Sequence, residues 1–230
     1  NTYLDGLRVM NDGGSYSSFA IDPWFLERIE IVKGPTSVLY GQGSPGGIVA
    51  LTSKRPEFRD GGEIRVSLGN NAQRSFAFDV TGPVDDEQRV AYRVTGIASA
   101  ADAQQDHVEL DRRAIAPSLT WDMTDETSVT LLAYLQRDPE GGYHSGLPYE
   151  GTVESRNGQK IDNTFFEGEP DYDLFRRDMT MVGYDLEHRI NRNWSALQKA
   201  RYLDSDVELK QVYAYGWASA TELNRYYSGG

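Results

Sequence analysis

The chain has 230 residues, a formal net charge of -12 and no cysteine. The lack of cysteine excludes disulfides, thiolate nucleophiles and zinc-thiolate sites. The acidic balance argues against nucleic acid as a partner, because no basic surface would neutralise a phosphate backbone. No run approaches the roughly 18 apolar residues of a membrane helix. This excludes helical spans only, because barrel strands alternate faces and leave a weak hydropathy signal.

Residues 21–56 combine short apolar runs with turn residues. Asp22-Pro23 predicts a turn followed by a short helical segment at 24–28. The β-rich runs at 29–32 and 48–52 predict two short strands. The segment between them is rich in glycine and proline, which indicates tight turns or close backbone approach.

The same segment contains a possible dinucleotide motif. Gly41, Gly43 and Gly46 satisfy the spacing G-x-G-x-x-G. That motif needs a helix that opens at the third glycine, whereas the residues at 48–52 favour a strand. We therefore predict that the chain does not bind a nucleotide here.

The run IDPWFLERIEIVKGPTSVLYGQGSPGGIVALTSKRPE, together with YLDGLRV at Tyr3 to Val9, resembles the plug domain of TonB-dependent outer-membrane receptors, in particular the hydroxamate (ferrichrome-type) branch. The resemblance implies a mainly β chain. Residues 1–58 would be the C-terminal part of a small mixed α/β plug domain. Residues 62–230 would be the first seven or so antiparallel strands of a transmembrane barrel of about 22 strands. Family members are far longer, so the chain is expected to be a fragment.

Alternating apolar residues after Gly62 predict the strands themselves. The last of these, at about 194–217, alternates less cleanly, carries many charges and is expected to project beyond a bilayer. The apolar positions of the other six are 64, 66 and 68; 76, 78 and 80; 90, 92 and 94; 115, 119 and 121; 129, 131 and 133; and 182, 184 and 186.

The connections also favour a barrel. Short polar turns at 83–87, 122–126 and 191–193 alternate with long connections at 101–111 and 139–178, as in outer-membrane barrels. A soluble β-sandwich that binds carbohydrate shows similar alternation, and a porin would share the barrel without the plug. The long connection at 139–178 and the plug-like segment disfavour both alternatives.

The resemblance implies function as well as fold. It implies a receptor in the outer membrane of a Gram-negative bacterium, in contact with lipid and lipopolysaccharide, that imports a ferric siderophore, with a hydroxamate expected. Import would use the TonB-ExbB-ExbD complex, which engages an N-terminal segment absent from this chain. Alternative ligands are a catecholate siderophore, heme and cobalamin. No enzyme motif is present.

Two aromatic residues near the end of the seventh predicted strand are candidate ligand contacts. Val212-Tyr213-Ala214-Tyr215-Gly216 resembles a VYGYG segment of the family whose tyrosines enter the binding pocket. A period of two places Tyr213 and Tyr215 on one face of a strand. The alternative is an aromatic girdle at the membrane interface.

Four further candidates come from the resemblance. Trp24 stands where the family has a plug tyrosine that faces the siderophore, and Tyr16 flanks the same turn; packing of Trp24 under the barrel wall is the alternative. Tyr143 and His144 lie in a segment that resembles the third external loop of ferrichrome receptors. His144 and Gly146 replace two aromatic residues of that loop, which suggests a ligand of another shape, such as a linear ferrioxamine.

We expect no protein ligand to a metal and no bound cofactor. Ferric iron would arrive fully chelated by the siderophore, so the protein needs a shaped aromatic wall and hydrogen-bond donors. The three histidines, His107, His144 and His188, are scattered along the sequence and lack the spacing of a metal site.

Overall fold

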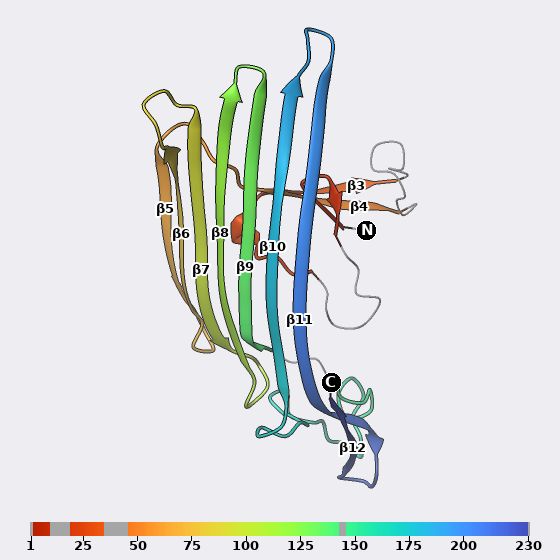
Figure 1. Ribbon diagram of the computed structural model, residues 1–230. Helices are drawn as coiled ribbons and strands as arrows, with labels where there is room; N and C mark the ends of the chain where they lie inside the picture. Colours follow the sequence, from red (N-terminus) through yellow and green to blue (C-terminus); the bar gives the residue numbers. More distant parts are fainter. Residues whose placement is uncertain (1, 10–18, 35–45, 143–145, 230) are drawn as a thin grey trace.

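The computed structural model describes residues 2–9, 19–34, 46–142 and 146–229, and these form two β-sheets (Figure 1). The first sheet uses residues up to Ser53, and the second begins at Gly61. No helix in these ranges is long and apolar enough to cross a membrane.

The first sheet, here called the plug sheet, has four strands in the order β2-β1-β4-β3. Strand β1 runs parallel to β4, and the other two pairings are antiparallel. The strands predicted at 29–32 and 48–52 are confirmed within β3 and β4, so the third glycine of the possible nucleotide motif precedes a strand. The bounds are β1 Thr2–Leu4, β2 Leu7–Arg8, β3 Leu26–Lys33 and β4 Gly47–Ser53.

The predicted helical segment at 24–28 is shorter than expected. A single 3-10 turn, η1, spans Pro23–Phe25, and β3 begins at Leu26. The Asp22 carboxylate accepts a hydrogen bond of 2.9 Å from the Trp24 N–H, which caps this turn. Proline fixes the first backbone angle, and the β-rich residues that follow return the chain to an extended conformation.

The second sheet, here called the wall, has eight antiparallel strands in sequence order from β5 to β12. Seven were predicted, and the eighth, β12, was missed because its first five residues, LNRYY, show no clean alternation. The bounds are β5 Gly61–Leu68, β6 Arg74–Pro83, β7 Val90–Asp102, β8 Glu109–Thr124, β9 Thr127–Gly141, β10 Leu174–Arg189, β11 Ser195–Trp217 and β12 Leu223–Gly229.

The connections differ from the predicted ones because the strands are longer than their apolar patterns. The connection predicted at 101–111 shrinks to 103–108, which is no longer than the turn at 84–89. The connection predicted at 139–178 shrinks to 142–173, since Arg177 pairs with Asp138 in the ladder. The asymmetry between the two ends of the wall therefore depends on the 142–173 connection. We call the end that carries it the loop end, and the other the turn end.

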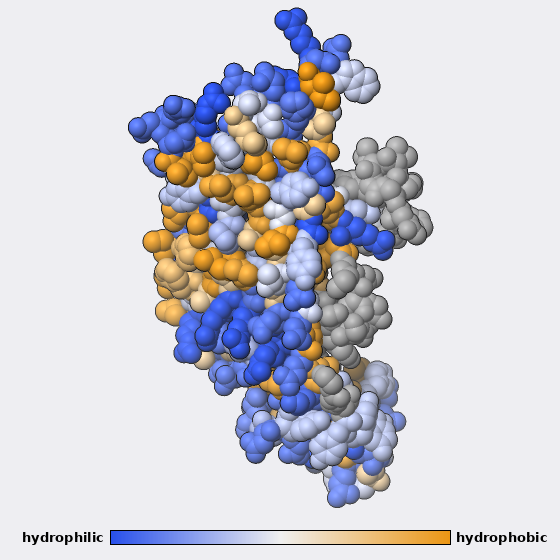
Figure 2. Space-filling view, in the orientation of Figure 1, coloured by the Kyte–Doolittle hydropathy of each residue, from blue (hydrophilic) through white to orange (hydrophobic). Residues whose placement is uncertain are grey.

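The wall has one apolar and one polar face, and the apolar face points away from the plug sheet. Figure 2 shows the apolar side chains gathered in a band across the wall, with hydrophilic residues at both ends. Outward ion pairs mark the border of the band toward the loop end, Arg137 with Asp178 at 3.5 Å and Arg176 with Glu208 at 3.6 Å. Exposed outward residues include Ile64, Val66, Leu68, Phe76, Val80, Ile115, Leu119, Trp121, Leu131, Leu135 and Val182.

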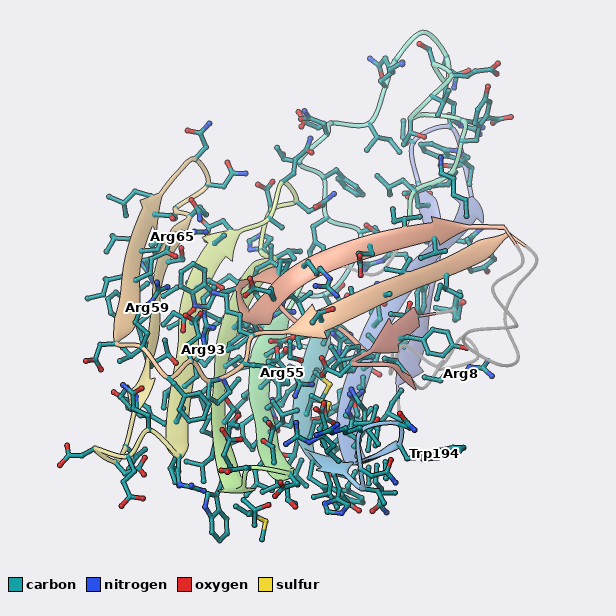
Figure 3. The ribbon with its side chains drawn as sticks, turned by 90° about the horizontal axis from the view of Figure 1, so that it is seen from above. Arg8, Arg55, Arg59, Arg65, Arg93 and Trp194 are labelled. Atoms are coloured by element: carbon teal, nitrogen blue, oxygen red, sulfur yellow. The ribbon has the colours of Figure 1, made fainter. Side chains whose placement is uncertain are left out.

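The plug sheet lies on the concave, polar side of the wall (Figure 3). Apolar packing between the two sheets is confined to a small core in which Leu4, Trp24 and Phe25 from the plug segment meet Tyr134 and Met181 from the wall. The Phe25 and Tyr134 rings meet edge to face, with centroids 4.9 Å apart. Around this core, polar side chains make most of the contacts between plug and wall.

Candidate functional site

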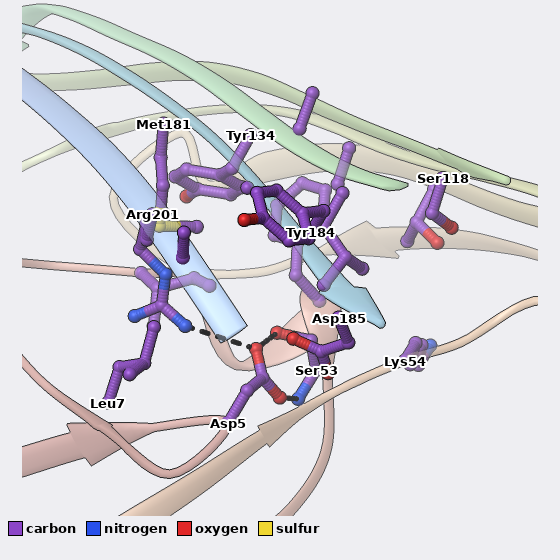
Figure 4. A pocket seen from close by; sticks show the side chains of 18 residues that line it. Asp5, Leu7, Ser53, Lys54, Ser118, Tyr134, Met181, Tyr184, Asp185 and Arg201 are labelled. Carbon is purple, nitrogen blue, oxygen red and sulfur yellow. Dashed lines mark hydrogen bonds and ion pairs between the residues drawn. The ribbon is translucent and has the colours of Figure 1, made fainter. Parts of the chain in front are cut away.

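Charged residues of the plug and wall form a cluster beside strand β1, which we call the inner clamp: Asp5, Arg55, Asp185, Lys199 and Arg201. The Asp5 carboxylate accepts hydrogen bonds from the N–H and the hydroxyl of Ser53, at 2.9 and 2.7 Å, and lies 3.5 Å from the Arg201 guanidinium (Figure 4). Both acidic side chains are less than a tenth exposed.

The inner clamp fastens the plug to wall strands β10 and β11. Arg201 donates to the carbonyl oxygen of Leu4 at 2.7 Å, and Lys199 donates to that of Asp5 at 3.1 Å. Arg55 of the segment after β4 pairs with Asp185 at 2.5 Å, and Lys199 pairs with the same carboxylate at 3.1 Å. Two buried acids thus join two cations of the wall and one of the segment that links the two sheets.

A second ion-pair group lies where the chain passes from the plug to the wall. Asp79 accepts from Lys54 at 2.8 Å and from two nitrogens of Arg93, both also at 2.8 Å. Arg93 reaches back to the carbonyl oxygen of Arg55 at 2.9 Å. These contacts fix the linking segment against β6 and β7.

A recess of about 410 Å³ lies on the inner face toward the loop end, bordered by the plug turn at Asp22 and by strands β7 to β10. We call it the outer recess. Its polar lining includes Asp22, Arg112, Asp138 and Arg177, and Phe175 adds an aromatic face. Its size and mixed polar and aromatic lining are typical of a site for a small organic ligand.

A chain of hydrogen bonds runs from the plug turn to the floor of the outer recess. The Asp22 N–H donates to the Tyr134 hydroxyl at 3.3 Å, and that hydroxyl donates to the Gln136 carboxamide oxygen. The Gln136 NH₂ group donates to Asp138 at 2.7 Å. Arg112 closes the circuit: it binds Asp138 through two nitrogens at 2.9 and 3.0 Å and lies 3.4 Å from Asp22.

Sequence reasoning missed this circuit. Tyr134, Gln136 and Asp138 occupy alternate positions of β9, and all three side chains are buried. The sequence analysis used the apolar positions of β9 and made no prediction for the polar residues between them. In a wall whose inner face is polar, those intervening positions carry the contacts with the plug.

Trp24 packs between the plug and the wall. Its side chain is 7% exposed, and its indole N–H donates to the carbonyl oxygen of Phe78 at 3.1 Å. The Lys54 ammonium lies 4.2 Å and the Arg65 guanidinium 4.4 Å from the ring centroid. These contacts support the packing alternative for Trp24, and its role in ligand binding stays a prediction.

Tyr213 and Tyr215 lie near the loop end of β11 and contact one common residue. The Tyr213 ring stacks on Tyr226 of β12 with centroids 5.3 Å apart, and the Tyr215 ring meets Tyr226 edge on at 5.6 Å. Tyr213 is in register with the β11 residues that face the plug, such as Arg201. A bulge at Tyr215 lets both rings reach Tyr226. Their role as ligand contacts stays a prediction.

The remaining candidates, Tyr16, Tyr143 and His144, lie outside the described residues, as does most of the glycine-rich turn at 35–45. Within the ranges that the structure covers, no three histidine or acidic side chains are arranged to hold a metal ion. This observation concerns the described residues alone, so the absence of an iron ligand from the protein stays a prediction.

Comparison with known protein families identifies the first part of the chain. The model of the TonB-dependent Receptor Plug Domain family matches residues 1–48. This stretch contains β1, β2, η1 and β3 and the first two residues of β4.

Similar curated proteins extend over the whole chain. A ferrioxamine B receptor of Salmonella typhimurium is 59% identical over 229 residues, which cover 100% of this chain and 33% of the relative. A ferrioxamine receptor of Yersinia enterocolitica is 47% identical, with 100% and 32% covered. A ferrichrome outer membrane transporter and phage receptor of Escherichia coli is 40% identical, with 95% and 29% covered. The chain spans about a third of the length of the curated relatives it matches.

Solved structures show the same fold. The closed form of the ferric-catecholate import receptor Fiu from Escherichia coli K12 superposes with a TM-score of 0.84 at 21% identity, over 99% of this chain and 34% of that one. A ferripyoverdine receptor of Pseudomonas aeruginosa gives 0.84 at 22% identity, over 95% and 29%. At this identity the likeness concerns the arrangement of plug and wall.

Proposed function

We propose that this chain, which consists of plug and barrel-wall segments of a TonB-dependent receptor, belongs to an outer-membrane protein that imports a ferric siderophore. The observation that carries the proposal is the hydrogen-bonded circuit from Asp22 through Tyr134 to Asp138. It joins a plug turn to the polar inner face of a sheet whose outer face is apolar, as a plugged barrel in lipid requires.

The outer recess is the proposed place of ligand contact. A ferric siderophore reaches the protein with its iron coordinated by its own oxygens, so the protein supplies shape and hydrogen bonds. The guanidinium groups of Arg112 and Arg177 can donate to ligand oxygens, and Phe175 offers a ring face. A ligand that draws Arg112 away from Asp22 would break the ion pair between the wall and the plug turn.

Transport requires that the plug change its contacts with the wall. The inner clamp provides such contacts at the end of β1, because Arg201 donates to the carbonyl oxygen of Leu4 and Lys199 to that of Asp5. We infer that energy delivered by the TonB-ExbB-ExbD complex is used to separate these groups. Ligand binding can favour this step only by binding the loosened state more tightly.

The ligand class proposed is a ferric hydroxamate, with a linear ferrioxamine preferred. Relatives whose names contain ferrioxamine are 59% and 47% identical, and one whose name contains ferrichrome is 40% identical. The change to His144 and Gly146 in the predicted third loop agrees with this order. A catecholate receptor is the second candidate, because one relative with that name is 30% identical over 211 residues.

Titration of the full-length receptor tests the ligand class. Tryptophan emission is recorded while ferrioxamine, ferrichrome, coprogen and a ferric catecholate are added to the purified protein. We expect saturable quenching by the hydroxamates, with the ferrioxamine binding most tightly. Quenching by the catecholate alone would overturn the hydroxamate assignment, and a lack of response to all four would overturn the siderophore proposal.

Replacement of Tyr213 and Tyr215 by alanine tests the aromatic pocket. If these rings form part of the ligand wall, affinity falls by about 1 to 3 kcal/mol, because buried aromatic contact is lost. Tyr202→Ala is the matched control, since Tyr202 belongs to the same strand and is 63% exposed on the outward face. Equal affinity of the double variant and the control would place the tyrosines in an interfacial girdle.

A further inference from the structure

A small second recess adjoins the outer recess at the loop end of the wall. Its volume is about 50 Å³, and it shares Glu140 and Phe175 with the outer recess. The volume exceeds the roughly 10 to 15 Å³ that a cavity needs to hold one water, but it is far too small for an iron chelate. The second recess therefore fits a single polar group that projects from a ligand bound in the outer recess. We call it the head-group recess.

Carboxylates line the head-group recess without matching cations. Glu109, Glu140 and Asp173 are among its lining residues. Neither glutamate forms an ion pair with any residue that the structure describes. Lys210 also lines the recess, but it is paired with Glu208 at 2.7 Å. The recess thus carries net negative charge.

One lining side chain has a buried acceptor that is not used. Gln211 is 3% exposed and lines the head-group recess, and its carboxamide oxygen has no hydrogen-bond partner within the described part of the chain. An unpaired buried carbonyl oxygen costs about 1 to 3 kcal/mol, so its presence points to a donor supplied from outside.

Asp173 offers a second free acceptor. Its Oδ1 atom accepts from the N–H groups of Glu169 and Val212, at 3.3 and 3.1 Å. No described residue donates to Oδ2. Together with Glu140, the recess therefore presents at least three acceptor groups, which is the number of donors on a primary ammonium.

We propose that the head-group recess binds the protonated primary amine of a ferric siderophore whose chelate occupies the outer recess. The inference rests on the proposed function and deepens it, because it names a part of the ligand that the receptor recognises. The ammonium would donate to Gln211, Asp173 and Glu140 and would neutralise the charge of the recess. The amine and the chelate would lie on either side of Glu140 and Phe175, the residues that line both recesses.

A comparison of two ligands tests the inference on the full-length receptor. One is a linear ferric trihydroxamate with a free terminal amine, and the other is the same chelate with that amine acetylated. We expect the wild type to bind the free amine about tenfold more tightly, because one charge pair and its hydrogen bonds are lost on acetylation. In the double variant E140Q and D173N this preference disappears, so that the two chelates bind with equal affinity.

The substitutions keep the size of each side chain, and D173N keeps an oxygen for the two backbone donors. E222Q is the control, because Glu222 lies in the exposed turn between β11 and β12 and contacts neither recess. Equal affinity of the wild type for both chelates, or a preference that survives in the double variant, overturns the head-group recess and leaves the receptor function intact. Failure of both chelates to bind overturns the proposed function itself.

Discussion

The Asp138 carboxylate pairs with two arginines from neighbouring strands. These ion pairs fix the side chains at the floor of the outer recess. Arg112 binds Asp138 through two nitrogens, and Arg177 lies 3.8 Å from Asp138 with its side chain 9% exposed. Asp138→Asn would remove the buried carboxylate that both guanidinium groups share. We expect the full-length receptor to lose about 3 to 5 kcal/mol of unfolding free energy, measured by urea unfolding in detergent.

Asp178→Asn is the control for this substitution. Asp178 pairs with Arg137 at 3.5 Å on the outward face, and both side chains are at least half exposed. An exposed pair contributes about 0 to 1 kcal/mol, so this variant should unfold close to the wild type. A similar loss in both variants would show that burial of the charges is not what stabilises the recess floor.

Asp173 gives the 142–173 connection a dependence on pH. Burial raises the pKa of this carboxyl, the backbone N–H groups of Glu169 and Val212 lower it, and the nearby Glu167 and Glu169 carboxylates raise it further, with a net rise. A carboxyl with a raised pKa in the folded state binds its proton more tightly there than in the unfolded chain. The folded connection therefore loses stability as the pH rises from below the ordinary aspartate pKa through the raised one.

Asp173→Asn should remove this dependence. Limited proteolysis of the full-length receptor measures it, because cleavage within the connection reports local opening. At a pH below the aspartate pKa the two proteins should be cleaved equally. At neutral pH the wild type should be cleaved faster, and a wild type that resists cleavage better at neutral pH would contradict the assignment.

At the scale of the strands, the outward face of the wall predicts sensitivity to charge. Leu131 of β9 is 49% exposed within the apolar band and pairs with Leu119 of β8. Lysine at the middle of a lipid-facing strand costs about 2 to 4 kcal/mol. We therefore expect Leu131→Lys to lower the unfolding free energy of the receptor in lipid vesicles by that amount.

Val84→Lys provides the comparison for this strand prediction. Val84 is 61% exposed but lies in the turn between β6 and β7, outside the band. Near the membrane interface the cost of lysine falls to about 0 to 1 kcal/mol. Equal losses for the two substitutions would mean that the apolar face is not in contact with lipid.

The sequence predicted the wall strands well where apolar residues alternate, and less well elsewhere. The apolar combs at 64–68 and 129–133 lie within β5 and β9. β12 was not predicted because it is short and polar. The ends of β9 and β10 were not predicted because paired charged residues replace apolar ones there. Ladder hydrogen bonds form without regard to side-chain polarity, so the hydrophobic pattern underestimates such strands.

The candidate site could be predicted from the sequence less completely than the strands. Tyr213 and Tyr215 were selected by the resemblance of their segment to the family's VYGYG segment, and the structure brings both to Tyr226. The circuit of Asp22, Tyr134 and Asp138 joins residues more than a hundred positions apart. No local pattern reports such pairings, because they depend on how the plug docks against the wall.

At the scale of the whole molecule, the wall is an open sheet. β5 and β12 each have a neighbour on one side only among the described strands. Hydrocarbon offers no partner for unpaired backbone groups, so an open edge is unfavourable in a bilayer. The 230-residue chain produced alone should not yield a folded species that resists SDS at room temperature, whereas the full-length protein should.

Gel mobility before and after boiling measures this difference, because compact barrels migrate faster than their unfolded chains. A heat-sensitive, fast-migrating form of the isolated chain would contradict the prediction. It would mean that the two sheet edges find partners in a second copy, and the mass of that form would show it.

The 23-residue strand β11 has a consequence for how a ligand is enclosed. Tyr213 stands roughly 60 Å along it from the turn end, at about 3.3 Å a residue. Its height is therefore set by a continuous ladder and not by a hinge. A movement of residues 146–173 relative to β11 would therefore change what surrounds Tyr213 without displacing Tyr213 itself.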